Sequence, residues 1–209
     1  REAASPEPDT VLHHVSAPRI EVIETAAPVE GEPWRMMDAL NQAMYDEMEA
    51  DDRVFLVGVD VAQAPFAITR GLVDVFGATR VRNTPISETA IVGTAIGASM
   101  AGLRPIAEVM YVDFIGVCFD QLLNQAAKLR YMTGGNVSLP LVLRTQFGAG
   151  RSSGSQHSQS LEALFAHIPG LTVVMPSTPA DAYGLLRSAI QDPNPVIFIE
   201  HRLTYGMKG

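Results

Sequence analysis

Apolar residues recur at helical spacing shortly after the first thirty residues. Met37, Leu40, Met44 and Met48 are three or four positions apart with polar residues between them, which predicts an amphipathic helix whose methionines pack into a core. Further along, short apolar runs alternate with longer segments of helical pattern. The predicted strands are 54–61, 105–110, 139–145, 171–175 and 195–200, and the predicted later helices are 88–102, 113–133, 158–167 and 179–191.

This alternation predicts the fold class. The strands are almost continuously apolar, as expected when both faces of a sheet are covered, and strands joined through helices run parallel. The sequence therefore predicts an α/β fold with three layers, α/β/α, around a mainly parallel sheet. Of the 209 residues, 47% are hydrophobic, which is enough to bury a sizeable core in a chain of this length.

Residues 1–33 differ from the rest in composition. They hold five prolines, and two arginines against seven acidic residues, so five of the eight excess negative charges of the chain lie here. Proline removes a backbone donor and disfavours helix at the preceding residue. We expect residues 1–33 to form a tail or linker, in which Val11-Leu12 or 20–23 docks on a neighbouring surface, and residues 34–209 to form the folded domain.

The overall charge and the single cysteine exclude several classes of protein. A net charge of −8 with no basic stripe argues against nucleic acid and against an anionic membrane surface as partners. No apolar run reaches about 18 residues, so no membrane-spanning helix is expected. Cys118 is the one cysteine and cannot form an internal disulfide, which favours a reducing compartment.

The helix predicted at 88–102 has an unusual composition. It holds three glycines and four alanines, although glycine costs about 1 kcal/mol relative to alanine inside a helix. Small side chains allow another backbone to approach closely. Ser87 is a candidate N-cap, and Glu88 falls in the first turn, where the helix dipole favours a carboxylate. Spacing alone favours a helix-capping role for Glu88 over a catalytic one.

A second unusual segment is the Gly- and Ser-rich loop 147–160, which follows a predicted strand and carries His157. Loops after parallel strands often hold the chemistry of α/β proteins, and a histidine titrates near neutral pH. Composition alone leaves acid–base chemistry and a solvated loop histidine equally open. The glycines lack the spacing and the following lysine of a phosphate-binding P-loop.

Seven short motifs follow one another along residues 84–177. They are Thr-Pro-Ile-Ser-Glu at 84–88, Gly-Leu-Arg-Pro-Ile-Ala-Glu at 102–108, Asp-Phe at 113–114, Asp-Gln at 120–121, Tyr-Met-Thr-Gly-Gly at 131–135, Gln-His-Ser-Gln-Ser at 156–160 and Pro-Gly-Leu-Thr-Val-Val-Met-Pro-Ser at 169–177. In this order they resemble the beta subunit of the thiamine-diphosphate-dependent first component of 2-oxo acid dehydrogenase complexes, in its pyruvate, branched-chain and acetoin versions. The resemblance covers residues 36–208 and implies the pyrimidine domain of the thiamine-diphosphate-binding fold.

The resemblance assigns roles to particular residues. It implies that Glu88 hydrogen-bonds the aminopyrimidine ring of thiamine diphosphate and activates the cofactor, which reverses the preference for a capping role. It implies that Phe114 packs on the pyrimidine ring. It implies that His157 lies near the reacting centre, where it stabilises charge or assists transfer to a lipoyl group, with Ser158 a weaker candidate. It also implies a structural potassium ion surrounded by five residues, Leu141, Ala189, Ile190, Asp192 and Asn194.

The resemblance also implies what surrounds this chain. Residues 2–8 look like the end of the alpha subunit of the same enzymes, which suggests fused alpha and beta regions with an alpha tail at 1–16 and a joint at 17–33. The Gly-Asp-Gly motif that binds magnesium and diphosphate belongs to the alpha region and does not occur in these residues, and neither does the family's C-terminal beta domain. The expected partners are the alpha region, a second copy of the chain and a lipoyl-bearing acyltransferase.

One residue departs from the family pattern. Where the family commonly has an acid after the first strand, this chain has Val59. In the family that acid is thought to line the route between paired active sites, so Val59 puts their communication in doubt.

The function implied is decarboxylation of a 2-oxo acid, pyruvate or a branched-chain acid, with acyl transfer to a lipoyl domain. Alternatives are an acetoin dehydrogenase, a relative of transketolase or deoxyxylulose-phosphate synthase without a lipoyl acceptor, and a non-catalytic assembly domain. The segments 144–151 and 159–163 look closest to acetoin- or pyruvate-type members. The expected location is the bacterial cytoplasm or, in a eukaryote, the mitochondrial matrix.

Overall fold

The structure, a computed structural model, describes residues 4–5, 7–19 and 33–209. Its centre is a six-stranded sheet in which every strand pairing is parallel, in the order β2-β1-β3-β4-β6-β5. The predicted α/β class with a parallel sheet is confirmed. The strands are β1 (Val54–Gly58), β2 (Val81–Asn83), β3 (Arg104–Tyr111), β4 (Val142–Phe147), β5 (Thr172–Val174) and β6 (Val196–His201).

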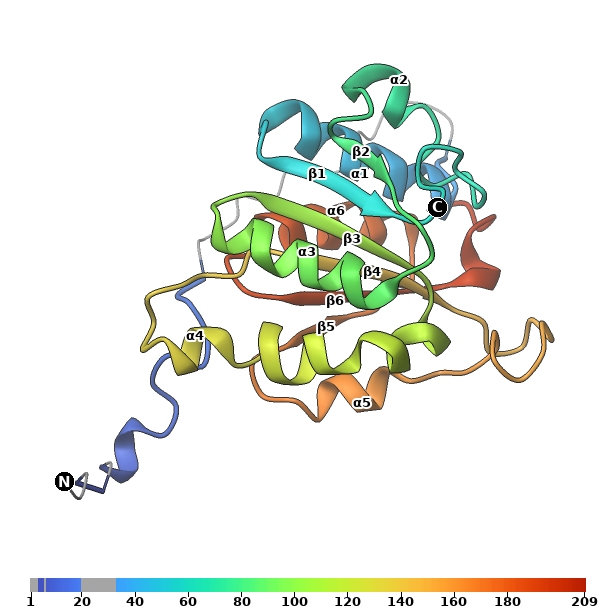
Figure 1. Cartoon of the computed structure of the whole chain (residues 1–209). Coiled ribbons are helices and arrows are strands. Elements are labelled where there is room, and N and C mark those ends of the chain that lie inside the picture. The colour runs from blue at the N-terminus through green and yellow to red at the C-terminus, as the bar shows by residue number, and fades with distance from the viewer. Residues whose placement is uncertain (1–3, 6, 20–32) are drawn as a thin grey trace.

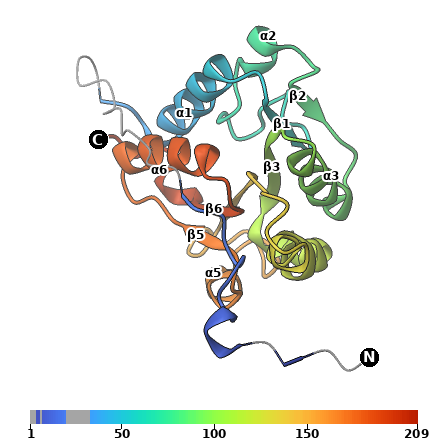
Figure 2. The ribbon, with the colours of Figure 1, turned by 90° about the vertical axis from the view of Figure 1, so that its left-hand side faces the viewer.

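Helices cover both faces of this sheet (Figures 1 and 2). On one face α1 (Met36–Ala50) packs beside α6 (Pro179–Gln191), and α2 (Leu72–Phe76) lies near the β2 edge. On the other face lie α3 (Glu88–Met100), the helical segment 112–132 and α5 (Glu162–Ala166). The protein therefore has the three layers that the sequence predicts.

Each face of the sheet has its own apolar core, because successive side chains of a strand point to opposite faces. On β3, Ile106 packs toward α1 and α6, whereas Ala107 packs toward α3 and the segment that follows β3. Leu40, Met44 and Met48 of the predicted methionine-rich stripe are fully buried against the sheet. The helical periodicity of this segment thus reports core packing, as predicted.

Two parts of the fold differ from the sequence prediction. The short elements α2 and β2 were not predicted, because β2 has three residues of which only Val81 is buried. The helix predicted over 113–133 consists of three pieces, a 3-10 helix at Val112–Cys118, a π-helix at Gln121–Ala126 and α4 at Leu129–Met132. Apolar spacing indicates a helix of some kind but does not fix its hydrogen-bond pattern.

Part of the N-terminal tail docks on the folded domain. The backbone N–H of Ala17 donates to Oδ1 of Asn194 at 2.5 Å, and the Ala17 carbonyl accepts from Nδ2 of the same side chain at 3.1 Å. Ala17 is buried by this contact, whereas Val11-Leu12 is exposed. The other apolar piece expected to dock, 20–23, lies outside the described residues.

Candidate functional site

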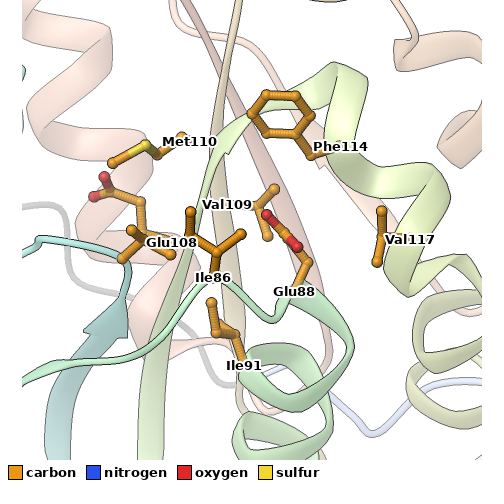
Figure 3. A pocket seen from close by; sticks show the side chains of 9 residues that line it. Ile86, Glu88, Ile91, Glu108, Val109, Met110, Phe114 and Val117 are labelled. Atoms are coloured by element: carbon orange, nitrogen blue, oxygen red, sulfur yellow. The ribbon is translucent and has the colours of Figure 1, made fainter.

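A pocket of about 330 Å³ opens at the carboxyl edge of the sheet, between β1 and β3. The strand order reverses here, because β2 lies on one side of β1 and β3 on the other. Open α/β sheets bind ligands at such reversal points. Val59 directly follows β1, and Val109 and Met110 come from the end of β3. The other lining residues are Ile86, Glu88, Ile91, Glu108, Phe114 and Val117 (Figure 3).

Glu88 brings a carboxyl group into this mainly apolar pocket. It is the first residue of α3, and Ser87 before it occupies the predicted N-cap position, although the Ser87 side chain makes no capping hydrogen bond. Glu88 is half-buried, and Figure 3 shows its carboxyl group between Val109 and Val117, below the Phe114 ring. Within the described residues no side chain or backbone group hydrogen-bonds this carboxyl group. It is therefore available to a ligand.

Phe114 and His157 come from distant segments and meet beside the pocket. Phe114 lies in the 3-10 helix after β3, and its ring centroid is 5.1 Å from that of His157. Tyr111, at the end of β3, contacts both rings, at 6.0 Å from Phe114 and 4.8 Å from His157. The structure thus brings the predicted residues Glu88 and Phe114 into one pocket and places His157 against its aromatic wall.

The loop that carries His157 is tied to the segment after β3. Oδ1 of Asp113 accepts hydrogen bonds from the backbone N–H of Gln159 at 3.2 Å and from its side-chain amide at 2.8 Å. Nη1 of Arg151 donates to the Tyr111 hydroxyl at 2.9 Å. At Gly148 any Cβ would overlap the carbonyl oxygen of His157. The loop therefore closes tightly on itself and holds His157 in one place.

Ser158 serves this loop as well. Its hydroxyl accepts a hydrogen bond from the backbone N–H of Ser153 at 3.0 Å, so it joins the two arms of the loop. That contact accounts for a serine here without any catalytic role.

Cys118 packs as the small hydrophobe that its apolar surroundings predict. Burial, with a smaller contribution from the nearby Glu88 carboxylate, raises the pKa of the Cys118 thiol to about 12. The thiol is therefore un-ionised near neutral pH and is a poor nucleophile.

Behind the pocket lies a buried charged cluster that was not predicted from the sequence. Arg144 of β4 forms a bidentate ion pair with Glu200 of β6, at 2.5 and 3.0 Å, and a second ion pair with Glu108 of β3. The Tyr205 hydroxyl donates to Glu200 at 2.6 Å. The available signal was the presence of charged residues inside strands that are otherwise apolar.

The five residues expected around a potassium ion lie at the opposite, amino-terminal edge of the sheet, because Leu141 precedes β4 and Asn194 precedes β6. The Leu141 carbonyl accepts from the Val196 N–H at 3.0 Å, and the Ile190 carbonyl accepts from Nη1 of Arg104 at 2.9 Å.

Two of the five residues in this potassium set, Asp192 and Asn194, hydrogen-bond to each other. Oδ1 of Asp192 accepts from the backbone N–H and the side-chain amide of Asn194, both at 2.8 Å. Ala189 belongs to the buried end of α6. None of these contacts shows whether a potassium ion binds, and the potassium site stays a prediction.

The described residues also bear on metal binding and on membrane insertion. No group of three or more His, Cys, Asp or Glu side chains in the described part of the chain is arranged to hold a metal ion. In the same residues no helix is both long and apolar enough to cross a bilayer.

Solved structures share this fold at low sequence identity. A split-gene transketolase described as an inactive beta4 tetramer superposes with a TM-score of 0.65 at 20% identity, covering 83% of this chain and 52% of that one. Transketolase from Leishmania mexicana gives a TM-score of 0.66 at 16% identity, covering 84% of this chain and 26% of that one. At these identities the likeness establishes the fold alone.

The family model described as "Transketolase, pyrimidine binding domain" matches residues 32–208. The chain belongs to this family. The match spans β1 to β6 and includes all nine residues that line the pocket.

Curated relatives of this pyrimidine-binding domain include several beta subunits. The Bacillus subtilis acetoin:2,6-dichlorophenolindophenol oxidoreductase subunit beta is 50% identical over 188 residues, 83% of this chain and 55% of the relative. The Bacillus subtilis 2-oxoisovalerate dehydrogenase subunit beta is 49% identical, covering 81% and 52%. The Rhizobium meliloti pyruvate dehydrogenase E1 component subunit beta is 50% identical, covering 81% and 37%. The chain spans about half the length of the first two.

Proposed function

We propose that this chain supplies the pyrimidine half of a thiamine diphosphate site in the first component of a 2-oxo acid dehydrogenase. The observation that carries the proposal is the unpartnered Glu88 carboxyl group in an apolar pocket at the strand-order reversal, beside the Phe114 ring. The relatives named as pyruvate and 2-oxoisovalerate dehydrogenase beta subunits support the reaction class.

The pocket fits the aminopyrimidine end of the cofactor. Its volume of about 330 Å³ is at the small end of ligand pockets, and its lining offers a flat aromatic face and several aliphatic side chains. Glu88 offers one hydrogen-bonding carboxyl group. When bound, thiamine diphosphate supplies the nucleophilic carbon that adds to a carbonyl group.

In this proposal the residues of the chain bind and orient. Phe114 packs against the pyrimidine ring, and Glu88 holds a proton between its carboxyl group and the ring nitrogen that faces it. Burial of the pocket excludes water and strengthens that hydrogen bond. His157, fixed by the Tyr111 and Phe114 rings, stabilises charge at the reacting centre or assists acyl transfer to a lipoyl group.

The complete site needs groups from outside these residues. We propose that the alpha region provides the magnesium and diphosphate ligands, that a second copy of the chain completes the assembly, and that a lipoyl-bearing acyltransferase accepts the acyl group. We also propose that residues 1–33 are a tail and linker, with an alpha-like end at 1–16 fused to a domain at 34–209. The motif at residues 2–8 that suggests the fusion lies partly outside the described residues.

The potassium ion remains part of the proposal. Its five candidate residues cluster at one edge of the sheet and offer mainly backbone oxygens, which suit a hard cation. The Leu141 and Ile190 carbonyls each accept one hydrogen bond, and a carbonyl oxygen has two lone pairs. A bacterial cytoplasm or a mitochondrial matrix is the proposed location, since relatives include a bacterial and a mitochondrial beta subunit.

Acetoin is the second candidate substrate, because the acetoin enzyme's beta subunit from Bacillus subtilis is 50% identical to this chain. A substrate panel distinguishes a 2-oxo acid from acetoin as the substrate. Pyruvate, branched-chain 2-oxo acids and acetoin are assayed on the complete enzyme with an artificial electron acceptor. Turnover of pyruvate or a branched-chain acid supports the proposal, and turnover of acetoin alone supports the second candidate.

Calorimetric titration tests the claim that the chain holds only half of the site. Thiamine diphosphate and magnesium are titrated into the isolated chain and then into the complete enzyme. We expect saturable binding only in the complete enzyme. Tight, saturable binding to the isolated chain would refute the shared site.

A further inference from the structure

The buried cluster behind the pocket joins three neighbouring strands, β3, β4 and β6. Arg144, Glu108, Glu200 and Tyr205 are exposed by 3%, 6%, 1% and 2% respectively. They form one connected group, with Arg144 between the two carboxyl groups and the Tyr205 hydroxyl on Glu200.

The charges in this cluster do not balance. If both carboxyl groups were ionised, two negative charges would share the single positive charge of Arg144 inside the protein. A buried negative charge without a positive partner is strongly disfavoured. A carboxyl group in that position usually binds a proton and becomes neutral.

The surrounding charges do not remove the imbalance. The Arg202 guanidinium lies over the Tyr205 ring at 4.7 Å and over the Phe66 ring at 4.9 Å. Within the described residues both carboxyl groups form their ion pairs with Arg144. Glu88 lines the same pocket as Glu108 and adds negative charge, although Figure 3 shows the two carboxyl groups pointing away from each other.

The hydrogen bonds distinguish the two carboxyl groups. Glu200 accepts three, two from the Arg144 guanidinium and one from Tyr205, so its negative charge is well stabilised. Glu108 accepts one, from Nη1 of Arg144, on Oε2. Within the described residues its Oε1 has no hydrogen-bond partner. The ionised form is therefore stabilised at Glu200 and much less so at Glu108.

We propose that the native protein holds one proton in this cluster at neutral pH and that Glu108 carries it. The cluster is then neutral overall, with Arg144 and Glu200 as the ion pair and Glu108 as an uncharged acid. Burial raises the pKa of Glu108 above its usual value; Arg144 opposes this rise, and the negative charge of Glu200 adds to it.

Glu108 is in consequence a positioning residue for the pocket. It lies on β3 directly before Val109 and Met110, which line the pocket with it. As a neutral acid it ties this strand to Arg144 without placing a second full negative charge near Glu88. A second negative charge there would repel a carboxylate at Glu88. The proposal does not depend on which cofactor or substrate binds.

Infrared difference spectroscopy on the full chain tests the assignment directly. The carbonyl stretch of an un-ionised carboxylic acid is separate from that of a carboxylate. At pH 7 we expect an acid band in the wild-type chain that shifts in D₂O and is absent from Glu108→Gln. Absence of the band from the wild type, or its retention in Glu108→Gln, overturns the proposal.

A matched pair of variants gives a second test, because Glu108→Gln and Glu200→Gln make the same change beside the same arginine. Glutamine resembles the neutral acid and cannot ionise in the unfolded chain, so at pH 7 Glu108→Gln should unfold at or above the wild-type midpoint, whereas Glu200→Gln should lower it strongly. Equal destabilisation by the two changes would show that Glu108 is an ionised partner of Arg144. If neither variant folds, the two changes are equally damaging, and the proposal is overturned in the same way.

The pH dependence has a definite sign. A carboxyl group whose pKa is raised on folding keeps its proton in the folded chain while the unfolded chain loses it, so folding is weakened as the pH rises above the unfolded value. The folding equilibrium constant of the wild type should fall by up to about tenfold per pH unit relative to Glu108→Gln in that window. Parallel curves for the two proteins would contradict the proposal.

Discussion

The rings of His157 and Phe114 meet edge to face, with centroids 5.1 Å apart and planes at 87°. One ring belongs to a loop after β4 and the other to the 3-10 helix after β3. Such a contact is worth about 0.5–1.5 kcal/mol beyond the area that it buries. Because the two rings touch, the position of His157 depends on that of Phe114. A ligand that packs against Phe114 is therefore expected to affect His157 as well.

Replacing Glu88 by glutamine tests the role of its charge. The substitution keeps the shape of the side chain but removes the carboxylate. Turnover by the complete enzyme should fall by about 10²–10⁴, the range typical of acid–base groups. The thermal midpoint serves as the control, since a helix-start charge contributes only about 0.3–1 kcal/mol. Activity close to wild type would return Glu88 to a helix-capping role.

Asp113→Ala is expected to release the loop that carries His157. It removes both hydrogen bonds to Gln159, each worth about 0.5–1.5 kcal/mol. Hydrogen exchange of the Gln159 backbone amide should become much faster. Gln159→Ala is the matched control, because it removes the side-chain bond and keeps the backbone bond. If the amide stays protected without Asp113, another contact holds the loop.

The Cys118 thiol should make the protein less stable in alkali. Its pKa is raised to about 12 in the folded chain, so above the ordinary thiol pKa only the unfolded chain loses this proton. The free energy of unfolding should therefore fall as the pH rises toward 12, by up to about 1.4 kcal/mol per pH unit. Urea titrations of wild type and Cys118→Ala measure this contribution. An equal pH slope in both would contradict it.

Asn194→Ala should detach the N-terminal tail. Its amide group makes both bonds to the Ala17 backbone, and hydrogen exchange at the Ala17 amide should lose its protection. Arg19→Ala is the control, because the Arg19–Asp192 pair at 3.4 Å is largely exposed on the arginine side and surface pairs contribute about 0–1 kcal/mol. Loss of Ala17 protection in Arg19→Ala would show that this ion pair, instead, holds the tail.

Much of the fold follows from local patterns in the sequence. The apolar runs predict β1, β3, β4 and β6, since a strand buried on both faces needs an apolar side chain at nearly every position. They also predict β5, an edge strand that is only half-buried. β2 was not predicted because two of its three residues are exposed, so it has no apolar run. Segment 112–132 keeps a helical spacing while its hydrogen-bond pattern changes twice, and spacing does not record that change.

Part of the site was predictable, from a family resemblance and not from local patterns of apolar residues. The roles of Glu88, Phe114 and His157 came from the order of motifs that resemble a family, whereas spacing alone favoured a capping role for Glu88. The buried cluster was missed because an arginine or glutamate in a strand has no partner until the register is known. Register places Glu108 beside Arg144 across β3 and β4, and no periodicity in a single segment contains that information.

An experimental structure of the complete enzyme with thiamine diphosphate bound tests the proposed site most directly. We expect the aminopyrimidine ring to lie in the pocket between β1 and β3, packed on Phe114, with a ring nitrogen within hydrogen-bonding distance of the Glu88 carboxyl group. A cofactor bound with its pyrimidine ring elsewhere, and Glu88 turned to the backbone of α3, would contradict the proposed site.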